Sequence, residues 1–198
     1  MYPCAHLLVF VQDDVMVKGE NSRSHVQVET CRRRSLRLRD YNYSQPGAYF
    51  VTICTHQRRC LLGEIALGTM CLNDSGSIVW NCWHRLLEHY PDLELDAFVI
   101  MPNHVHGVIA VVDPVGAGLK PAPTFVYRRH GLTEIVRAFK TFSSRRINQL
   151  RGTPGRRIWQ RGYYEHVIRN EADLHEIRQY VANNPLKWEL DEENPETL

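Results

Sequence analysis

Two apolar segments separated by a short turn predict a β-hairpin in the middle of this chain of 198 residues. Residues 93–100 and 105–112 are rich in branched and apolar side chains, and Pro102 and Asn103 between them are typical turn residues. Strands joined by so short a turn run antiparallel and pair with each other. The hairpin therefore requires an antiparallel sheet, around which the other elements must be arranged.

Strand and helix patterns alternate on both sides of this hairpin. Before it, residues 48–55 have strand composition, and residues 78–90 carry apolar positions at helical spacing after the helix-start residues 73–76. After it, residues 132–150 form an amphipathic helical pattern and residues 164–168 a strand pattern.

A last helix is predicted between Asn170, a favourable N-cap residue, and Pro185, which cannot continue it. The order is strand, helix, strand, strand, helix, strand and helix. This is the split βαβ arrangement. We therefore predict an α+β fold, a ferredoxin-like βαββαβ sandwich with an antiparallel sheet and an added C-terminal helix.

The domain that these elements form spans residues 34–188. Residues 1–33 show no clean periodicity, and we expect an N-terminal extension there. Residues 113–131 form a Gly- and Pro-rich loop insertion, and residues 189–198 form an acidic tail. An apolar fraction of 43% allows this single domain to bury a core of ordinary size.

The composition also indicates in which cellular compartment the protein is expected. No apolar stretch approaches the length that spans a bilayer, so we expect no membrane association. The six cysteines form no Cys-x-x-Cys pair, which favours reduced thiols in a cytoplasmic protein over a disulfide framework or a zinc knuckle.

Positive charge is concentrated in parts of the chain. Between Lys120 and Asn170 there are twelve Lys and Arg residues and only two acidic ones. Such clusters favour a surface that binds a polyanion, although a solvated surface has the same composition. The candidate contacts to a polyanion such as a nucleic acid are Arg33, Arg34, Arg37, Arg39, Lys140, Arg145, Arg146, Arg157, Trp159 and Arg161.

His104 and His106 lie two residues apart at the start of a predicted strand. Side chains at this spacing point to one face of a sheet, so both imidazoles can approach one ion, while Val105 turns into the opposite layer. Imidazole binds divalent transition metals. A His-x-His sequence alone is weak evidence for metal binding. The alternative is that the two histidines are ordinary polar residues near a turn.

Tyr180 and Asn184 lie four residues apart on the last helix, hence on one face. A helical tyrosine is more often a packing residue than a nucleophile, and Asn184 could simply cap the helix. The functional alternative is a His-His-Asn metal site beside the phenol. Tyr163 and Tyr164 are competing nucleophiles that lack an amide one turn further on.

A metal beside a tyrosine suits phosphoryl chemistry. A phenol is a weak nucleophile at neutral pH, since its pKa is about 10. A divalent cation bound to the scissile phosphate would polarise it and offset developing charge. Attack by Tyr180 would then form a phosphotyrosine link and free a 3′ hydroxyl, so that religation needs no ATP.

Four segments carry a resemblance to a known family. They are residues 48–55, Ala97 to Gly107 with its Pro-Asn-His-Val-His-Gly sequence, Ile158 to Arg169 with Trp-Gln-Arg, and Tyr180 to Pro185. Together they resemble the REP-associated tyrosine transposases, relatives of the single-tyrosine HUH transposases of small bacterial insertion sequences.

The resemblance implies the same α+β sandwich and a metal-dependent endonuclease and strand transferase. It implies that His104, His106 and Asn184 bind Mg²⁺ or Mn²⁺ and that Tyr180 is the nucleophile. The implied partner is single-stranded or hairpin DNA carrying repetitive extragenic palindromes. The insertion-sequence relatives work as homodimers, whereas REP-associated relatives can act as monomers, so the resemblance leaves monomer and homodimer open.

Two other functions remain open from the sequence. A domesticated nucleic-acid-binding module could keep the fold and the basic clusters without turnover. A zinc hydrolase could use the His-x-His pair, but the sequence offers no evident third His or carboxylate ligand nearby. The intact set of His104, His106, Tyr180 and Asn184 favours the nuclease.

Overall fold

The computed structural model describes residues 45–112, 130–191 and 193–195, which belong to one compact unit. No helix in these ranges is both long and apolar enough to span a bilayer. The elements follow in the order β1 (Gly47–Cys54), η1 (His56–Arg58), β2 (Gly63–Ala66), β3 (Thr69–Leu72), α1 (Asp74–His84), α2 (Leu86–His89), β4 (Leu93–Ile100), β5 (His104–Val111), α3 (Leu132–Leu150), β6 (Tyr164–Ile168), α4 (Glu171–Asn183) and η2 (Pro185–Leu190).

The central sheet has four strands in the order β4-β5-β1-β6, and every neighbouring pair is antiparallel. The predicted hairpin is β4 and β5, which pair from Leu93 opposite Val111 to Ile100 opposite Val105. Along the chain, β1, α1, β4, β5, α3 and β6 alternate as strand, helix, strand, strand, helix and strand. The predicted α+β class with an antiparallel sheet is therefore confirmed.

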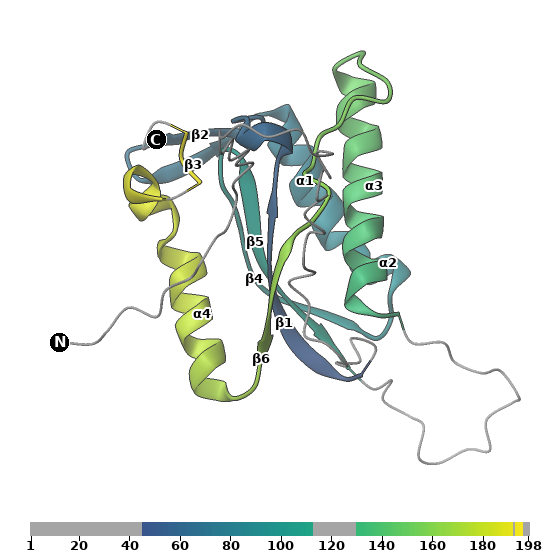
Figure 1. Cartoon of the computed structure of the whole chain (residues 1–198), viewed down its shortest axis with the longest axis vertical. Helices are drawn as coiled ribbons and strands as arrows, with labels where there is room; N and C mark the ends of the chain where they lie inside the picture. Colours follow the sequence, from purple (N-terminus) through teal and green to yellow (C-terminus); the bar gives the residue numbers. More distant parts are fainter. Residues whose placement is uncertain (1–44, 113–129, 192, 196–198) are drawn as a thin grey trace, which may run out of the picture. The chain divides into compact units, whose positions relative to one another are not determined.

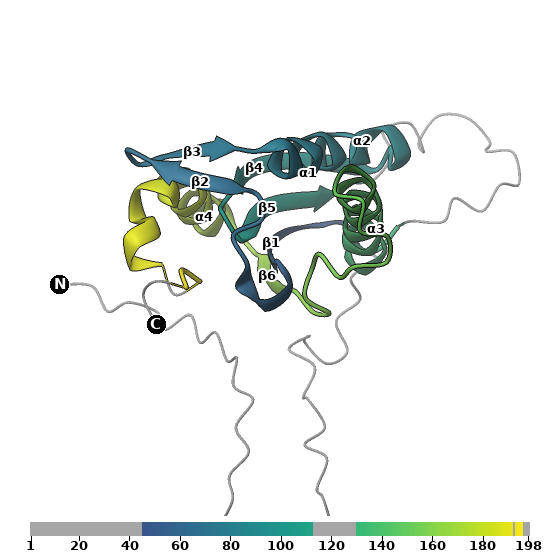
Figure 2. The ribbon, with the colours of Figure 1, turned by 90° about the horizontal axis from the view of Figure 1, so that it is seen from above.

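Helices cover both faces of the sheet. Figure 1 shows α4 on one side and α1, α2 and α3 on the other, and Figure 2 shows the same layers from above. In β1, Tyr49 packs into the main core with Trp83 of α1, whereas the next residue, Phe50, packs with Val181 of α4. Strand alternation thus divides the apolar side chains between two cores.

Gly107 of β5 allows a close approach between the sheet and α1. A Cβ atom there would overlap the indole ring of Trp83. That indole stacks on Phe98 of β4, with ring centroids 4.4 Å apart. The glycine that follows the His-Val-His sequence is therefore required by packing on the face opposite the histidines.

The helix predicted over residues 78–90 is two helices, α1 and α2, separated at Arg85. Asn73 caps the N-terminus of α1 as predicted: its side chain accepts a hydrogen bond from the backbone N–H of Gly76. Asn170 caps α4 in the same way, accepting from the backbone N–H of Asp173.

The hairpin β2–β3 was not predicted from the sequence. Its turn places Leu67 and Gly68 in the left-handed region, with φ of 51° and 71°. Leucine is rare there, since turns of this kind usually carry Asn or Asp at that position. The turn therefore lacks its usual sequence signal. The hairpin lies beside η2 (Figure 2). Gly68 of its turn is close to Leu186.

Candidate active site

The two histidines of the His-x-His pair lie on the face of β5 that α4 covers, and Val105 between them is buried in the opposite core. The Nε2 atoms of His104 and His106 are 2.9 Å apart. The side chains are only 0% and 3% exposed, so both rings are removed from solvent. The structure thus brings together two imidazole nitrogens that can share one ion.

Asn103 fixes the orientation of His104. Its Nδ2 group donates to the backbone carbonyls of Arg58 and Glu193. Its Oδ1 is therefore the atom that faces Nδ1 of His104, at 2.8 Å. An amide oxygen can only accept, so Nδ1 of His104 carries the proton and Nε2 presents a lone pair.

Thr52 of β1 holds His106 from the neighbouring strand. Its hydroxyl is 2.9 Å from Nδ1 of His106, and the two residues face each other in the β1–β5 register. Because a hydroxyl can donate or accept, Thr52 tolerates either tautomer of His106. The Nε2 atom of His106 can therefore donate to His104 without a cation, and can present a lone pair when a cation is bound.

Burial keeps both imidazoles neutral. Desolvation lowers the pKa of His106 to about 3. The pKa of His104 is also well below its usual value, because the ring is desolvated and lies near His106 and Arg58. A neutral imidazole is the form that binds a metal ion.

Tyr180 of α4 reaches this pair from the helix layer. Its phenolic oxygen is 3.4 Å from Nε2 of His106. The ring meets His106 and Phe50 edge-on, with centroids 5.2 and 5.9 Å away. Tyr180 is 38% exposed, so its side chain packs against these rings and is also partly open to solvent.

Asn184 directly follows α4 and is 2% exposed. Its Oδ1 atom is buried and has no hydrogen-bond partner among the described residues. An unsatisfied buried amide oxygen costs free energy, so it calls for an explanation. A bound cation could supply the missing partner.

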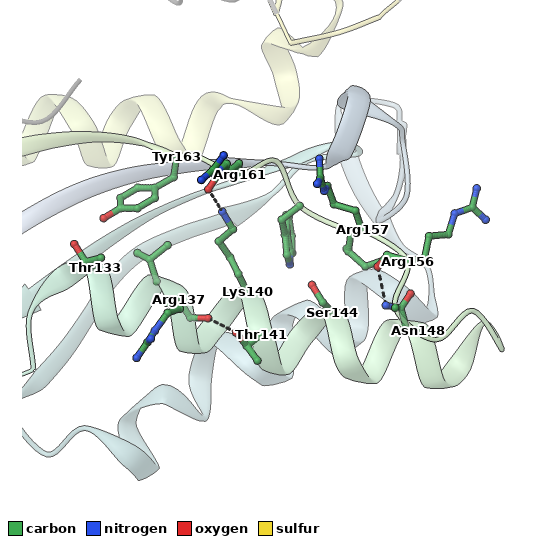
Figure 3. Close-up of a pocket in the computed structure, with 14 residues that line it drawn as sticks. Thr133, Arg137, Lys140, Thr141, Ser144, Asn148, Arg156, Arg157, Arg161 and Tyr163 are labelled. Atoms are coloured by element: carbon green, nitrogen blue, oxygen red, sulfur yellow. Dashed lines mark hydrogen bonds between the residues drawn. The ribbon is translucent and has the colours of Figure 1, made fainter. Parts of the chain in front are cut away.

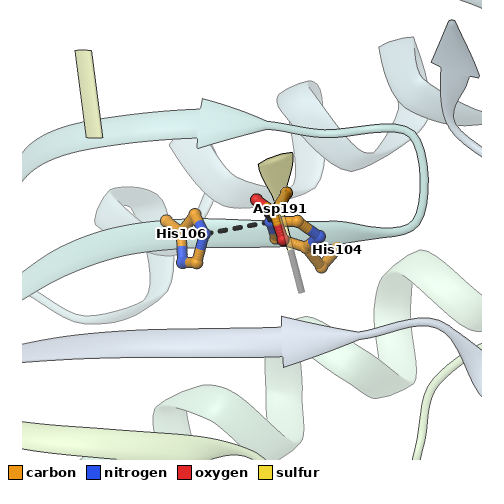
Figure 4. Close-up of side chains that lie close together, drawn as sticks. All are labelled: His104, His106 and Asp191. Atoms are coloured by element: carbon orange, nitrogen blue, oxygen red, sulfur yellow. Dashed lines mark hydrogen bonds and ion pairs between the residues drawn. The ribbon is translucent and has the colours of Figure 1, made fainter. Parts of the chain in front are cut away.

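Asp191 is the functional candidate that the sequence did not single out. Its Oδ2 atom is 3.9 Å from Nε2 of His104. One ligand atom each from His104, His106 and Asp191 lie within 4.8 Å of one another, and Figure 4 shows the three side chains turned toward one another. Two imidazoles and a carboxylate suit Mn²⁺ and related divalent cations.

The competing tyrosines serve packing. Tyr164 of β6 meets Phe50 edge-on, with centroids 6.4 Å apart, and burial raises the pKa of its phenol. Tyr163 is partly buried and packs against the main core. Burial makes the Tyr164 oxygen harder to ionise and hence a poorer nucleophile.

A basic groove of about 580 Å³ lies between α3 and residues 155–163. Its basic lining residues are Arg137, Lys140, Arg156, Arg157 and Arg161. Figure 3 shows these side chains along the helix and the facing segment. Arg137 and Arg156 were not among the predicted contacts.

The predicted DNA contacts fall into different environments. Arg157 and Arg161 are exposed in the groove, whereas Arg145 and Arg146 are exposed on α3 outside its lining. The remaining arginine candidates, Arg33, Arg34, Arg37 and Arg39, lie outside the described residues.

Two candidates have internal roles. Trp159 is 3% exposed and donates its indole N–H to Ser143, so it offers hardly any ring surface for base stacking. The ammonium of Lys140 donates to three successive backbone carbonyls, those of Gln160, Arg161 and Gly162. Lys140 therefore fastens the facing segment to α3, and its charge contributes to the groove from a fixed position.

Comparison with known proteins finds relatives of similar sequence. A Haemophilus influenzae protein of uncharacterised function is 39% identical over 170 residues, covering 81% of this chain and 92% of its own. A second H. influenzae protein, provisionally named a REP-associated tyrosine transposase, is 26% identical over 147 residues, covering 74% of each. No family model matches the chain.

A solved structure of a REP-associated tyrosine transposase bound to a REP hairpin has the same fold. Its TM-score is 0.52 at 21% identity, and the match covers 77% of this chain and 73% of that one. Fold and site together define an α+β protein whose antiparallel sheet has helices on both faces and a buried histidine pair beside a helical tyrosine. In sequence and in fold the chain is similar to REP-associated tyrosine transposases.

Proposed function

We propose that this protein is a metal-dependent endonuclease and strand transferase that cleaves single-stranded DNA through a covalent phosphotyrosine. One observation carries the proposal. The phenolic oxygen of Tyr180, a residue that is 38% exposed, lies 3.4 Å from Nε2 of the buried His106. Packing alone would not require a polar tyrosine beside two imidazoles that face each other.

The residues present fit a divalent cation. Two neutral imidazoles at 2.9 Å offer nitrogen ligands, and the orphaned Oδ1 of Asn184 and the nearby carboxylate of Asp191 offer oxygen. This mixed donor set suits Mn²⁺ and Mg²⁺. When bound, the cation would polarise the scissile phosphate and offset charge in the transition state.

Tyr180 supplies the nucleophile. Its phenolic oxygen forms a bond to phosphorus while the bond from phosphorus to the 3′ oxygen breaks. The phenol loses its proton, and the departing 3′ oxygen gains one to become a hydroxyl. One phosphodiester replaces another, so the reverse attack by a 3′ hydroxyl rejoins DNA without ATP.

The packing around Tyr180 orients this attack. Phe50 lies under the phenol edge and also stacks on His106, with centroids 5.4 Å apart. The tyrosine ring therefore has a fixed position relative to the histidine pair. Fixed geometry between nucleophile and phosphate is a major contribution to rate.

Single-stranded DNA, including the foot of a hairpin, is the proposed substrate. A flexible strand can align its phosphate with the phenol, whereas duplex stacking would hold the phosphate out of line. The REP-associated tyrosine transposase of known structure is bound to a REP hairpin. The exposed arginines of the basic groove, Arg157 and Arg161, provide charge for the phosphate backbone.

A denaturing gel tests this function. Purified full-length protein is incubated with labelled single-stranded hairpin DNA from the flanks of its own gene, in Mn²⁺ or in EDTA. We expect a Mn²⁺-dependent cut and a labelled adduct that survives denaturation. Tight binding without any cut in Mn²⁺ or Mg²⁺ would contradict the proposal and support a nucleic-acid-binding module instead.

A further inference from the structure

We propose that the carboxylate of Asp191 is a metal ligand, so that the C-terminal segment completes the cation site formed by His104 and His106. This inference rests on the proposed metal-dependent function. The Oδ2 atom of Asp191 is 3.9 Å from Nε2 of His104, and the Asp191 side chain is 10% exposed. A carboxylate oxygen beside two imidazole nitrogens is a suitable third ligand for a divalent cation.

The carboxylate is held in one orientation. Its other oxygen, Oδ1, accepts the backbone N–H of Glu193 at 2.8 Å. This leaves Oδ2 as the oxygen on the His104 side. Oδ1 of Asp191 is thus bonded to the backbone, while Oδ2 lies near Nε2 of His104. That Nε2 carries a lone pair because Nδ1 donates its hydrogen bond to Asn103.

The segment around Asp191 is fastened to the body of the domain at two places. Nε of Arg58 lies 2.7 Å from the carboxylate of Glu193, and these side chains are 19% and 10% exposed. The Nδ2 group of Asn103 donates to the backbone carbonyl of Glu193. Asn103 therefore contacts both the C-terminal segment and the His104 ring, which links the position of Asp191 to the tautomer of His104.

Charge balance favours an acidic ligand here. Two neutral imidazoles leave the full double charge of a divalent cation in a site whose histidines are almost entirely buried. Transferring an uncompensated cation out of water is very costly, and a carboxylate reduces that cost. Neutral Asn184 cannot do so, and Asp191 is the carboxylate that the described residues place beside the pair.

The C-terminal segment then carries both the proposed nucleophile and the proposed oxygen ligands. Tyr180 stands in the last turn of α4, Asn184 follows the helix, and η2 leads directly to Asp191. The nucleophile and the oxygen ligands come from one continuous stretch of chain, and the nitrogen ligands come from β5. A shift of η2 would therefore alter both the metal and the nucleophile.

Mn²⁺ binding to the full chain, measured by the electron paramagnetic resonance of free Mn²⁺, tests the inference without any cleavage. We expect Asp191→Asn to weaken Mn²⁺ binding by about 10-fold or more, at least as much as the loss of a hydrogen-bond partner behind a metal ligand does. The matched control is Glu189→Gln, which removes the same charge from an exposed side chain of η2 and should leave Mn²⁺ affinity unchanged.

An unchanged or tighter affinity of Asp191→Asn would overturn the inference and leave the proposed function standing. Failure of the unmodified protein to bind Mn²⁺ would overturn both. Electron-nuclear double resonance on unmodified protein with ¹³C-labelled aspartate carboxylates avoids any folding defect of the variant. A direct ¹³C coupling to bound Mn²⁺ supports the inference, and its absence contradicts it.

Discussion

The phenolic oxygen of Tyr180 lies 3.4 Å from Nε2 of His106, although 74 residues separate them in the chain. The contact exists because α4 packs on the sheet face to which the even-numbered residues of β5 point. On that face Phe50 supports both rings. The geometry of the site therefore depends on how α4 is docked as much as on the histidine motif.

Asn103→Ala should weaken Mn²⁺ binding by about 10- to 100-fold, the usual effect of losing a hydrogen-bond partner behind a metal-binding histidine. The change removes the acceptor for Nδ1 of His104, so Nε2 is no longer held as a lone pair. The ¹⁵N chemical shifts of the His104 ring report the tautomer directly.

Asn148→Ala is the matched control for this variant. Asn148 is also a buried asparagine, which donates to the backbone of Arg156 and accepts from Thr153. It belongs to α3, on the side of the sheet opposite α4 (Figure 1). It should lose stability but keep the Mn²⁺ affinity and the His104 tautomer of the unmodified protein. Equal losses of metal affinity in both variants would show a general folding effect and refute the orienting role of Asn103.

The double variant Arg157→Gln/Arg161→Gln should weaken binding to single-stranded DNA and flatten its salt dependence. Each lost phosphate contact lowers the slope of log K against log salt by roughly 0.7 for a single strand. Fluorescence anisotropy over a salt series measures that slope. An unchanged slope would show that the phosphates of bound DNA do not contact the arginines of the basic groove.

The pair Arg145→Gln/Arg146→Gln provides the comparison, because these exposed arginines of α3 do not line the groove. The charge pattern of the sequence predicts that their removal also weakens binding and flattens the salt slope. A slope that changes only in this pair would place the DNA along the outer surface of α3.

Asp96→Asn should lower the free energy of unfolding by about 0.5 kcal/mol at neutral pH, the usual magnitude for a partly exposed ion pair. Asp96 of β4 makes two bonds, of 2.9 and 2.6 Å, to the guanidinium of Arg178 on α4. The hydrogen bond from Arg178 lowers the pKa of the Asp96 carboxyl. Its contribution is therefore present above the unfolded pKa of about 3.9 and is lost as pH falls through the lower folded value.

Urea denaturation at pH 7 and at pH 3 measures this difference. The difference in the free energy of unfolding between the unmodified protein and Asp96→Asn should be smaller at pH 3 than at pH 7. Glu94→Gln, at an exposed position of the same strand, is the control. If this difference in the free energy of unfolding is the same at both pH values, the ion pair does not stabilise the packing of α4 against β4.

The sequence predicted the parts of the fold that are strongly periodic. The strands β1, β4, β5 and β6 and the helices α3 and α4 lie within a residue or two of their expected positions, because alternation and capping residues mark them. The β2–β3 hairpin escaped prediction because its turn uses Leu67 in a conformation that leucine rarely adopts. The break at Arg85 escaped it because apolar spacing continues across the two helices.

The candidate site was predictable where its spacing is local. Residues two apart on a strand or four apart on a helix share a face whatever the rest of the fold does. Asp191 has no such relation to the histidines, and it lies within an acidic run that is typical of a solvated tail. Its place depends on η2 and on the ion pair between Arg58 and Glu193, which join residues distant in the sequence.

The central claim is that Tyr180 is the nucleophile, and peptide mapping of the DNA-linked protein by mass spectrometry tests it most directly. After reaction with hairpin DNA in Mn²⁺, we expect the nucleotide adduct on the peptide that contains Tyr180. Tyr180→Phe should give neither adduct nor cleavage while binding DNA nearly as well as the unmodified protein. An adduct on Tyr163 or Tyr164, or cleavage by Tyr180→Phe, would contradict the account.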